Sequence, residues 1–327
     1  MLLAVTNDQT TIRLESRHLT LSQDDKLAGT VPVNLIDRVV LSGAANVSGS
    51  VFQALLMRHI PIIMLDNCNR YLGQMHYSPS GNCERIALQY HVYQEHDLLP
   101  AQRLLETKIY NQKRVLQRLA TARKEILPER KIFNSLQRSL SRQNSSEELL
   151  GLEGFAAKKY FTALSRYIPQ WCGFTGRQRQ PTPDPFNAAL SYSYTIMTGE
   201  IENLIRLHAL DPGIGFLHNK SYNTPALALD LLEIFRACFC DMLVLDLFNH
   251  NRLRAEHFSF NKESGQYLLN QMGKNIFFRS WEKKRHSHFK YQGVQTTWQA
   301  IWNRQVLMWL NFLQQKDVNE LKFYKMR

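Results

Sequence analysis

The segment from residue 226 to residue 248, ALALDLLEIFRACFCDMLVLDLF, is apolar on nearly every side when it is drawn as a helix. Such a helix has no face suited to water, so it must run through the centre of a domain built from other helices. Asp230 and Glu233 interrupt it on one face. Carboxylates are seldom buried unless their charge is used. The segment therefore predicts a helical domain with a functional site inside it.

The spacing of apolar residues divides the chain into two parts near residue 84. Before it, short stretches bounded by turn residues indicate strands: LLAV, TIRLE, HLTLS, VPVNLIDRVVLSG, PIIMLD and RYLGQMHY. A short helix is expected from about residue 48 to 58, and beyond residue 84 the spacing is helical throughout. We expect an α+β protein in which a small, β-sandwich-like domain (1–83) precedes a larger all-α domain (84–327), with the boundary in SPSGNCER at 78–85.

The net charge of +12 is unevenly distributed along the chain. Residues 1–83 carry six basic and six acidic side chains, whereas residues 274–327 carry eleven basic and three acidic ones. Concentrated positive charge is typical of nucleic-acid-binding proteins, although a solubilising basic face is the alternative. We expect no membrane partner, because no apolar run reaches membrane-spanning length and the first residues do not resemble a signal peptide. The five cysteines contain no C-x-x-C pair and are expected to be reduced thiols.

Basic and aromatic residues alternate in the C-terminal segment, where Lys283, Lys284, Arg285 and Lys290 are expected to bind DNA. The neighbouring aromatic residues are Phe277, Phe278, Trp281, Phe289 and Tyr291. These rings could equally belong to the core, and for Trp298, Trp302 and Trp309, at helical spacing, the core is the expectation. The helical stretch 103–131 is a second candidate surface, on which Lys108 and its basic neighbours either follow phosphates or form an ordinary solvated face.

Two further polar groups accompany the acidic pair of the central helix. His218 lies in the loop after GIGF, from which it can reach the face of Asp230 and Glu233. Glu153 lies on or beside the apolar stripe of ELLGLEGFAAKKYFTAL, next to two glycines that suggest the close approach of another group. Carboxylates and an imidazole together suit Mg²⁺ or Mn²⁺, which is the usual equipment for phosphodiester chemistry.

Each of these residues also has a purely structural explanation. A lone histidine is more often hydrogen-bonded than metal-bound, and Asp230 and Glu233 could pair with Arg236. Glu153 has the weakest such explanation, because Ala157 stands at the i+4 position where a pairing base would be favourable. The residues by themselves leave the metal site and the structural explanation evenly balanced.

Four segments resemble, in order, the CRISPR-associated integrase of spacer acquisition, a metal-dependent DNA endonuclease. They are LLGLEGFAAKKYF, RQPTPDPFNAALSYSYTIMTGEIENLI, LDPGIGFLH and LALDLLEIFR. The β-rich first part and helical second part also agree with this family over nearly the whole chain, although the N-terminal match is one of pattern only. One departure is Ala237, where the family often has proline, and which we expect to let the helix continue without a break.

The resemblance implies the roles of the site residues. Glu153, His218 and Glu233 would be the ligands of Mg²⁺ or Mn²⁺, Asp230 an acidic partner in the same catalytic site, and Arg236 a base near the DNA phosphate. It implies transesterification, in which a DNA 3′-hydroxyl attacks a phosphodiester of the CRISPR repeat. It also implies a homodimer formed through the β-rich domain, a complex with a small ferredoxin-fold adaptation protein, double-stranded and branched DNA as substrates, and a prokaryotic cytoplasmic location.

Two other functions remain open at this point. A stand-alone metal-dependent nuclease or recombinase could use the same residues on branched DNA or transposon ends, and strand joining from free 3′-hydroxyls would distinguish the integrase from it. A non-catalytic DNA-binding scaffold would need only the basic segment. The presence of Glu153, His218 and Glu233 together argues against the scaffold.

Overall fold

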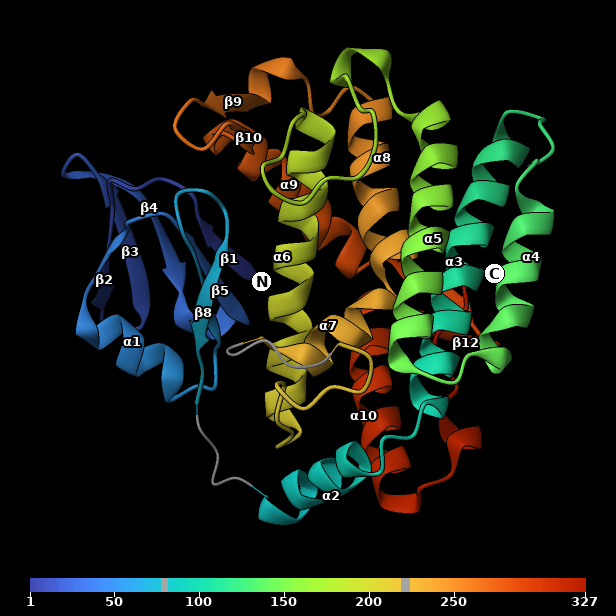
Figure 1. Cartoon of the computed structure of the whole chain (residues 1–327). Helices are drawn as coiled ribbons and strands as arrows, with labels where there is room; N and C mark the ends of the chain where they lie inside the picture. The colour runs from blue at the N-terminus through green and yellow to red at the C-terminus, as the bar shows by residue number, and fades with distance from the viewer. Residues whose placement is uncertain (78–81, 219–223) are drawn as a thin grey trace.

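The computed structural model describes residues 1–77, 82–218 and 224–327. Its N-terminal part is a β-rich layer and its C-terminal part is a set of helices, so the expected α+β class is confirmed (Figure 1). The strands of the β-rich layer are β1 (Leu2–Val5), β2 (Thr10–Glu15), β3 (His18–Gln23), β4 (Lys26–Pro32), β5 (Arg38–Ser42), β6 (Asn46–Val47), β7 (Ile62–Leu65) and β8 (Tyr71–Met75). The expected short helix is α1 (Gly49–Leu56).

Two four-stranded sheets make up the β-rich layer. One has the order β1-β5-β7-β8, with β1, β5 and β7 parallel and β8 antiparallel, and the other has the order β4-β3-β2-β6. Apolar side chains from both sheets, such as Val39 and Leu19, meet in one core that α1 closes. The segment VPVNLIDRVVLSG is not the single strand that we expected: it joins the end of β4 to β5 through the short 3₁₀ helix η1 (Val33–Leu35).

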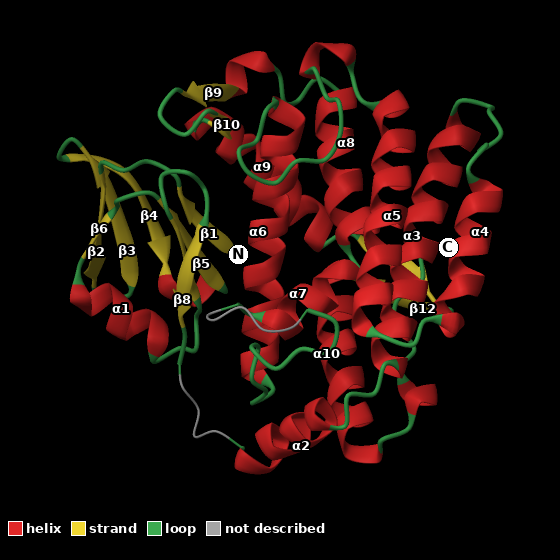
Figure 2. Ribbon diagram, in the orientation of Figure 1, coloured by secondary structure: helices red, strands yellow, loops and turns green. Residues whose placement is uncertain are grey.

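Helices dominate the second part, with two small hairpins near its end (Figure 2). The helices are α2 (Cys83–Gln94), α3 (Leu99–Ala122), α4 (Arg130–Ser139), α5 (Ser146–Leu164), α6 (Pro185–Leu207), α7 (Ala226–Glu233), α8 (Met242–Asn249), α9 (Gln271–Arg285) and α10 (Trp298–Gln315). The hairpins are β9 (Phe258–Asn261) with β10 (Gln266–Leu269), and β11 (His288–Tyr291) with β12 (Val294–Thr297). Among the described residues, no helix is long and apolar enough to cross a bilayer.

The apolar segment 226–248 lies at the centre of the helical part, as its composition predicts. It is not one continuous α-helix, however. Between α7 and α8 the chain forms the π-helix η5 (Arg236–Asp241). Our expectation of an unbroken helix at Ala237 is therefore wrong, because one turn is wound more widely than the α-helices on either side of it.

The two parts share a core rather than meeting at a loose junction. Helix α6 lies against the sheet of β1, β5 and β7 (Figure 1). The packing is close, because a Cβ added at Gly199 would lie 2.7 Å from Ile63 Cδ1. The buried Arg38 side chain of β5 forms ion pairs with Glu200 of α6, at 2.7 Å, and with Glu282 of α9. The expected boundary at 78–85 lies partly outside the described residues, since the structure resumes at residue 82.

Candidate active site

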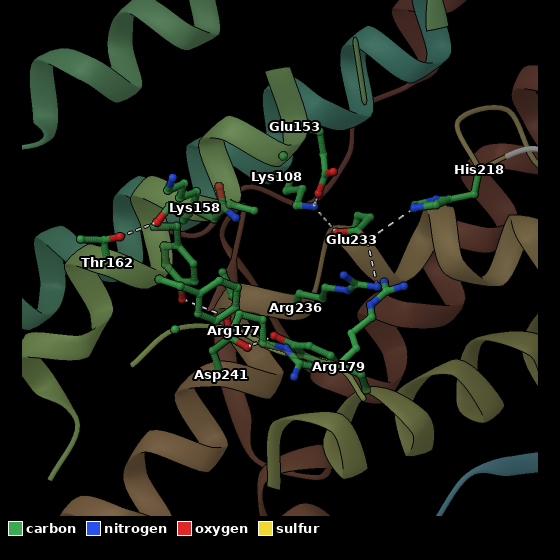
Figure 3. Close-up of a pocket in the computed structure, with 18 of the residues that line it drawn as sticks. Lys108, Glu153, Lys158, Thr162, Arg177, Arg179, His218, Glu233, Arg236 and Asp241 are labelled. Carbon is green, nitrogen blue, oxygen red and sulfur yellow. Dashed lines mark hydrogen bonds and ion pairs between the residues drawn. The ribbon is translucent and has the colours of Figure 1, made fainter. Parts of the chain in front are cut away.

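Helices α3, α5 and α7 and the loop before α7 line a cavity of about 630 Å³ (Figure 3). Glu153 reaches it from α5, Glu233 from α7 and His218 from the loop. The structure thus brings together the three residues that the sequence singled out as candidate metal ligands. Gly154 also lines the cavity, and a Cβ at this position would meet no atom within 4 Å. Contrary to our expectation, no described group approaches Gly154 closely, and this glycine borders open space in the cavity instead.

Asp230 holds the His218 loop rather than facing the other carboxylates. Its fully buried side chain accepts hydrogen bonds from the backbone N–H groups of Phe216, Leu217 and His218 at 2.6, 3.0 and 2.8 Å. It also accepts from His218 Nδ1 at 2.7 Å. Gly215 makes this packing possible, because a Cβ there would lie 2.7 Å from Asp230 Oδ2. Asp230 is therefore a positioning residue that leaves His218 Nε2 free to face the cavity.

Glu233 lies at the centre of the cluster and is almost completely buried. Burial raises the pKa of its carboxyl, but the positive charges of Arg236 and Lys108 and the nearby His218 outweigh this effect and lower the pKa to about 2. Arg236 lies 3.0 Å from one carboxylate oxygen and Lys108 Nζ 2.6 Å from the other. His218 Nε2 faces the same group at 4.0 Å. Glu233 is therefore ionised and ready to hold a cation.

Lys108 is the site residue that the sequence analysis placed wrongly. We expected it on a basic, solvent-facing side of its helix, but its side chain is 5% exposed and its ammonium lies between Glu153 and Glu233 (Figure 3). Glu153, for which the sequence offered no pairing base, is paired with this lysine. The base comes from α3, 45 residues away in the chain, so no helical spacing could reveal it.

The residues present fit a divalent metal ion, although Lys108 now separates the carboxylates. Among the described residues, no three His, Cys, Asp or Glu side chains lie close enough to hold an ion without rearrangement. Both carboxylate oxygens of Glu233 are nevertheless buried. Each faces a cation, but neither accepts a hydrogen bond of good geometry from a described residue. Two carboxylate groups and an imidazole Nε2, with Nδ1 held by a carboxylate, form the donor set that such ions use. A metal ion would replace the Lys108 ammonium.

Known proteins support the same family as the sequence resemblance. The family model of the CRISPR associated protein Cas1 matches residues 3–283. The chain belongs to the Cas1 family. A CRISPR-associated endonuclease Cas1 from Rhodospirillum rubrum is 30% identical over 297 residues, which cover 86% of this chain and 85% of that protein. The resemblance stated from the four sequence segments is confirmed.

Solved structures share the Cas1 fold over the whole chain. A casposase bound to its integration product matches with a TM-score of 0.88 at 22% identity, over 99% of this chain and 94% of that chain. A Cas6-RT-Cas1–Cas2 complex matches with a TM-score of 0.85 at 22% identity, over 100% of this chain and 36% of that longer one. At this identity the likeness concerns the fold.

The floor of the Cas1 cavity contains basic and phenolic groups that the sequence analysis missed. Arg177 and Arg179 come from the loop before α6; Arg179 begins the segment RQPTPDPFNAALSYSYTIMTGEIENLI, but neither arginine was named as a site residue. Arg177 donates hydrogen bonds to Asn187 Oδ1 and Ser191 Oγ, both at 3.0 Å. The two arginines lie just before a proline-rich turn, and their positive charge was the sequence signal that could have marked them as site residues. With Arg236 they add positive charge to the cavity that contains the carboxylates.

The π-helix η5 decides which of its side chains reach this cavity. Arg236 and Asp241, five residues apart, both line it, whereas Cys238 lines a second cavity on the other side of η5. In a π-helix the hydrogen bonds join residues five apart, so side chains at this spacing come close to the same face. The wider turn thus places Arg236 and Asp241 together.

The DNA-binding residues expected near the C-terminus fall into two groups. Lys283 and Lys290 are exposed, as DNA contact requires. Arg285, in contrast, is 4% exposed and lies 3.4 Å from Asp37 and 3.5 Å from Glu282. We therefore remove Arg285 from the proposed DNA surface, because its charge is already neutralised inside the protein. Lys284 is only partly accessible and donates to the carbonyl of Phe239 at 2.8 Å.

The aromatic residues of this region are mainly core residues. Phe277, Phe278 and Trp281 are buried, and Trp302 and Trp309 are buried as expected from their spacing. Phe289, Tyr291 and Trp298 are only partly buried and line the second cavity.

Asp241 is expected to make the stability of this Cas1 protein depend on pH. Burial raises the pKa of Asp241 to about 6, despite hydrogen bonds from Tyr194 at 2.5 Å and Tyr160 at 2.9 Å. Between about pH 4 and 6 the folded state then holds a proton that the unfolded chain releases, so stability falls as pH rises through this window, by up to about 3 kcal/mol. Denaturant unfolding at several pH values should show this fall in wild type and a smaller one in Asp241→Asn.

The control for this titration is Asp246→Asn, which changes a carboxylate with 44% exposure on the same helical segment. It should retain the wild-type pH dependence. Equal slopes in wild type and Asp241→Asn would contradict the assignment.

Proposed function

We propose that Glu153, His218 and Glu233 form the metal site with which this Cas1 endonuclease and integrase cuts and joins DNA during CRISPR spacer acquisition. The observation that carries the proposal is the orientation of His218. Its Nδ1 is engaged by Asp230, so that Nε2 points toward the Glu233 carboxylate at 4.0 Å. A histidine held in this way by a carboxylate is the usual arrangement of an imidazole that binds a metal ion.

The residues of the cavity would have different roles in the reaction. A bound Mg²⁺ or Mn²⁺ supplies neutralisation of phosphoryl charge and activation of an attacking oxygen. Glu153, Glu233 and His218 would hold it, and Asp230 keeps the His218 ring and its loop in place. Arg236, whose guanidinium lies over the Tyr194 ring at 4.9 Å, would bind the phosphate of the strand being joined.

Strand joining is the experiment that tests the proposed function. A duplex with free 3′-hydroxyl ends is offered with a CRISPR repeat in the presence of Mg²⁺ or Mn²⁺. We expect covalent joining at the repeat that stops when the metal is chelated. Cleavage of branched DNA without any joining would favour the second candidate function, a stand-alone nuclease or transposon-end recombinase. The match to the casposase fold makes this the alternative to exclude.

Two structural relatives support the partners that we propose for this protein. One structural relative is a Cas1–Cas2 complex and another is bound to its integration product. We propose a complex with a small ferredoxin-fold adaptation protein, double-stranded and branched DNA as substrates, and the cytoplasm of a prokaryote as the location. Exposed apolar side chains of the β-rich layer, among them Leu35, Met57 and Leu72, support a homodimer formed through the predicted domain 1–83.

Removing the Lys108 ammonium is expected to strengthen metal binding. In Lys108→Met the stem of the side chain is retained, but the charge that separates Glu153 from Glu233 is lost. The two carboxylates would then repel each other until a cation binds, so Mn²⁺ affinity should rise by about tenfold or more. Titration of Mn²⁺ followed by electron paramagnetic resonance measures this change directly. Thermal melting should show lower stability without metal and a larger increase on adding Mn²⁺ than in wild type.

Lys158→Met is the matched control, since Lys158 lines the same cavity without an ion pair to either carboxylate. Its Mn²⁺ affinity should stay close to that of wild type. Unchanged or weaker Mn²⁺ binding in Lys108→Met would show that the ammonium does not occupy the cation position.

A further inference from the structure

A second cavity, of about 560 Å³, lies on the opposite side of η5 from the carboxylate cluster. Helices α8, α9 and α10, the β11–β12 hairpin and the C-terminal segment surround it. Cys238 of η5 lines this cavity, whereas its neighbour Ala237 lines the first one. The second cavity therefore has walls of its own, and none of the candidate metal ligands belongs to them.

The lining of this cavity carries positive charge that the described residues do not neutralise. Arg118, Lys283 and Lys290 make no hydrogen bond or ion pair with any described residue. The carboxylate that lines the cavity, Asp246, already faces Arg252 at 3.8 Å. Such a concentration of cations around a hollow attracts an anionic ligand.

Lys284 adds a cation deeper in the wall. Its ammonium donates to the carbonyl of Phe239 and lies 4.9 Å from the centre of the Phe239 ring. It forms no ion pair within the described part of the chain. Burial lowers the pKa of Lys284 to about 8, and the charge of Arg118 acts in the same direction. An anion in the cavity would relieve both effects.

Aromatic rings form another part of the cavity lining, with neighbouring rings tilted or edge-on to one another. Phe289 and Trp298 have ring centres 4.9 Å apart, Trp298 and Tyr324 5.3 Å, and Tyr324 and Tyr291 4.9 Å. All four residues line the cavity. Proteins bind the bases and phosphates of a single strand with accessible aromatic rings beside basic side chains, and Phe289, Tyr291 and Trp298 are partly accessible here.

We propose that this second cavity binds a nucleotide unit of single-stranded DNA, with the base against the aromatic rings and the phosphate between Lys283 and Lys290. An acidic peptide could use the cations but would gain nothing from stacking on the partly accessible rings of Phe289, Tyr291 and Trp298. The volume, within the range of small-ligand sites, also suits one compact unit rather than a duplex. The site is separate from the proposed metal centre, so either proposal can fail without the other.

Binding of a short oligothymidylate to the whole protein tests this proposal. Stacking of a base should quench the fluorescence of Trp298, which lines the cavity, and Trp298→Phe identifies its share among the five tryptophans. The double variant Lys283→Ala/Lys290→Ala should bind the oligonucleotide about tenfold more weakly or worse and show a smaller dependence on salt. Both lysines are exposed, so the variant should fold normally.

The control is Lys131→Ala/Lys262→Ala, which removes two exposed charges elsewhere and should bind as wild type does. Glu153→Ala should also retain oligonucleotide binding, and the double lysine variant should retain Mn²⁺ binding, which separates the two sites. Three outcomes would overturn the proposal: equal weakening in the control, no quenching of Trp298, or displacement of the oligonucleotide by an acidic peptide at equal concentration.

Discussion

Glu153→Ala is expected to abolish both cleavage and strand joining, with a loss of about a thousandfold or more. The substitution removes one charged ligand from the proposed metal site and leaves the cavity otherwise intact. Folding should survive, because Lys108 keeps Glu233 as its counter-charge and Glu153 is only partly buried. DNA binding should also persist, since the substitution leaves every basic residue that we propose to bind phosphate in place. Joining, DNA binding and thermal melting are measured on the same preparation.

Glu147→Ala provides the control, because Glu147 is an exposed residue on the same helix, α5. It should join DNA at the wild-type rate. Near-normal joining by Glu153→Ala would exclude Glu153 as a ligand. Glu233→Ala is expected to be equally inactive but less stable, since it leaves Arg236 without its ion-pair partner at 3.0 Å and removes one of the two partners of Lys108. Glu233→Gln is therefore the better variant for activity measurements.

Asp230→Ala is expected to have the largest effect on stability among the site residues. It would leave the backbone N–H groups of Phe216, Leu217 and His218 without the acceptor that now serves all three. Each unsatisfied buried group costs about 1–3 kcal/mol, but two of these three hydrogen bonds are only partly buried, so a total loss near the lower end, about 3–5 kcal/mol, is expected. Denaturant unfolding measures the loss.

A milder substitution separates this structural role from metal binding. In Asp230→Asn one oxygen still accepts from the loop, but the amide cannot accept from His218 Nδ1 in the same way. We expect Mn²⁺ affinity to fall by about 10–100-fold with a smaller loss of stability. His218→Ala should lose the metal while the loop stays folded. Wild-type Mn²⁺ affinity in Asp230→Asn would show that Asp230 does not orient the imidazole.

The fold class and the central position of residues 226–248 could be predicted from the sequence, because both depend on local periodicity. The pairing of Glu153 could not, because its partner Lys108 lies on another helix. Arg285 was misjudged for the same reason: its neighbours in the chain are basic, but Asp37, 248 residues away, neutralises it. Asp230 lies only three residues from Glu233, yet the loop that it holds decides where its oxygens point. Local patterns identify which residues matter and tertiary contacts decide what each one does.

The wide turn at η5 determines which side chains of this segment face each of the two cavities. Deleting one residue between Arg236 and Asp241 would let the chain wind as an ordinary α-helix, with i→i+4 hydrogen bonds in place of i→i+5. Arg236 and Asp241 would then be four residues apart, a spacing that an α-helix also places on one face, so α8 would keep nearly the same orientation relative to α7. Asp241 would stay on the side of Tyr160 and Tyr194, and the change would be confined to the residues within the turn, among them Cys238, which lines the basic cavity. One wide turn is thus enough to let a single buried segment line two separate cavities with different residues.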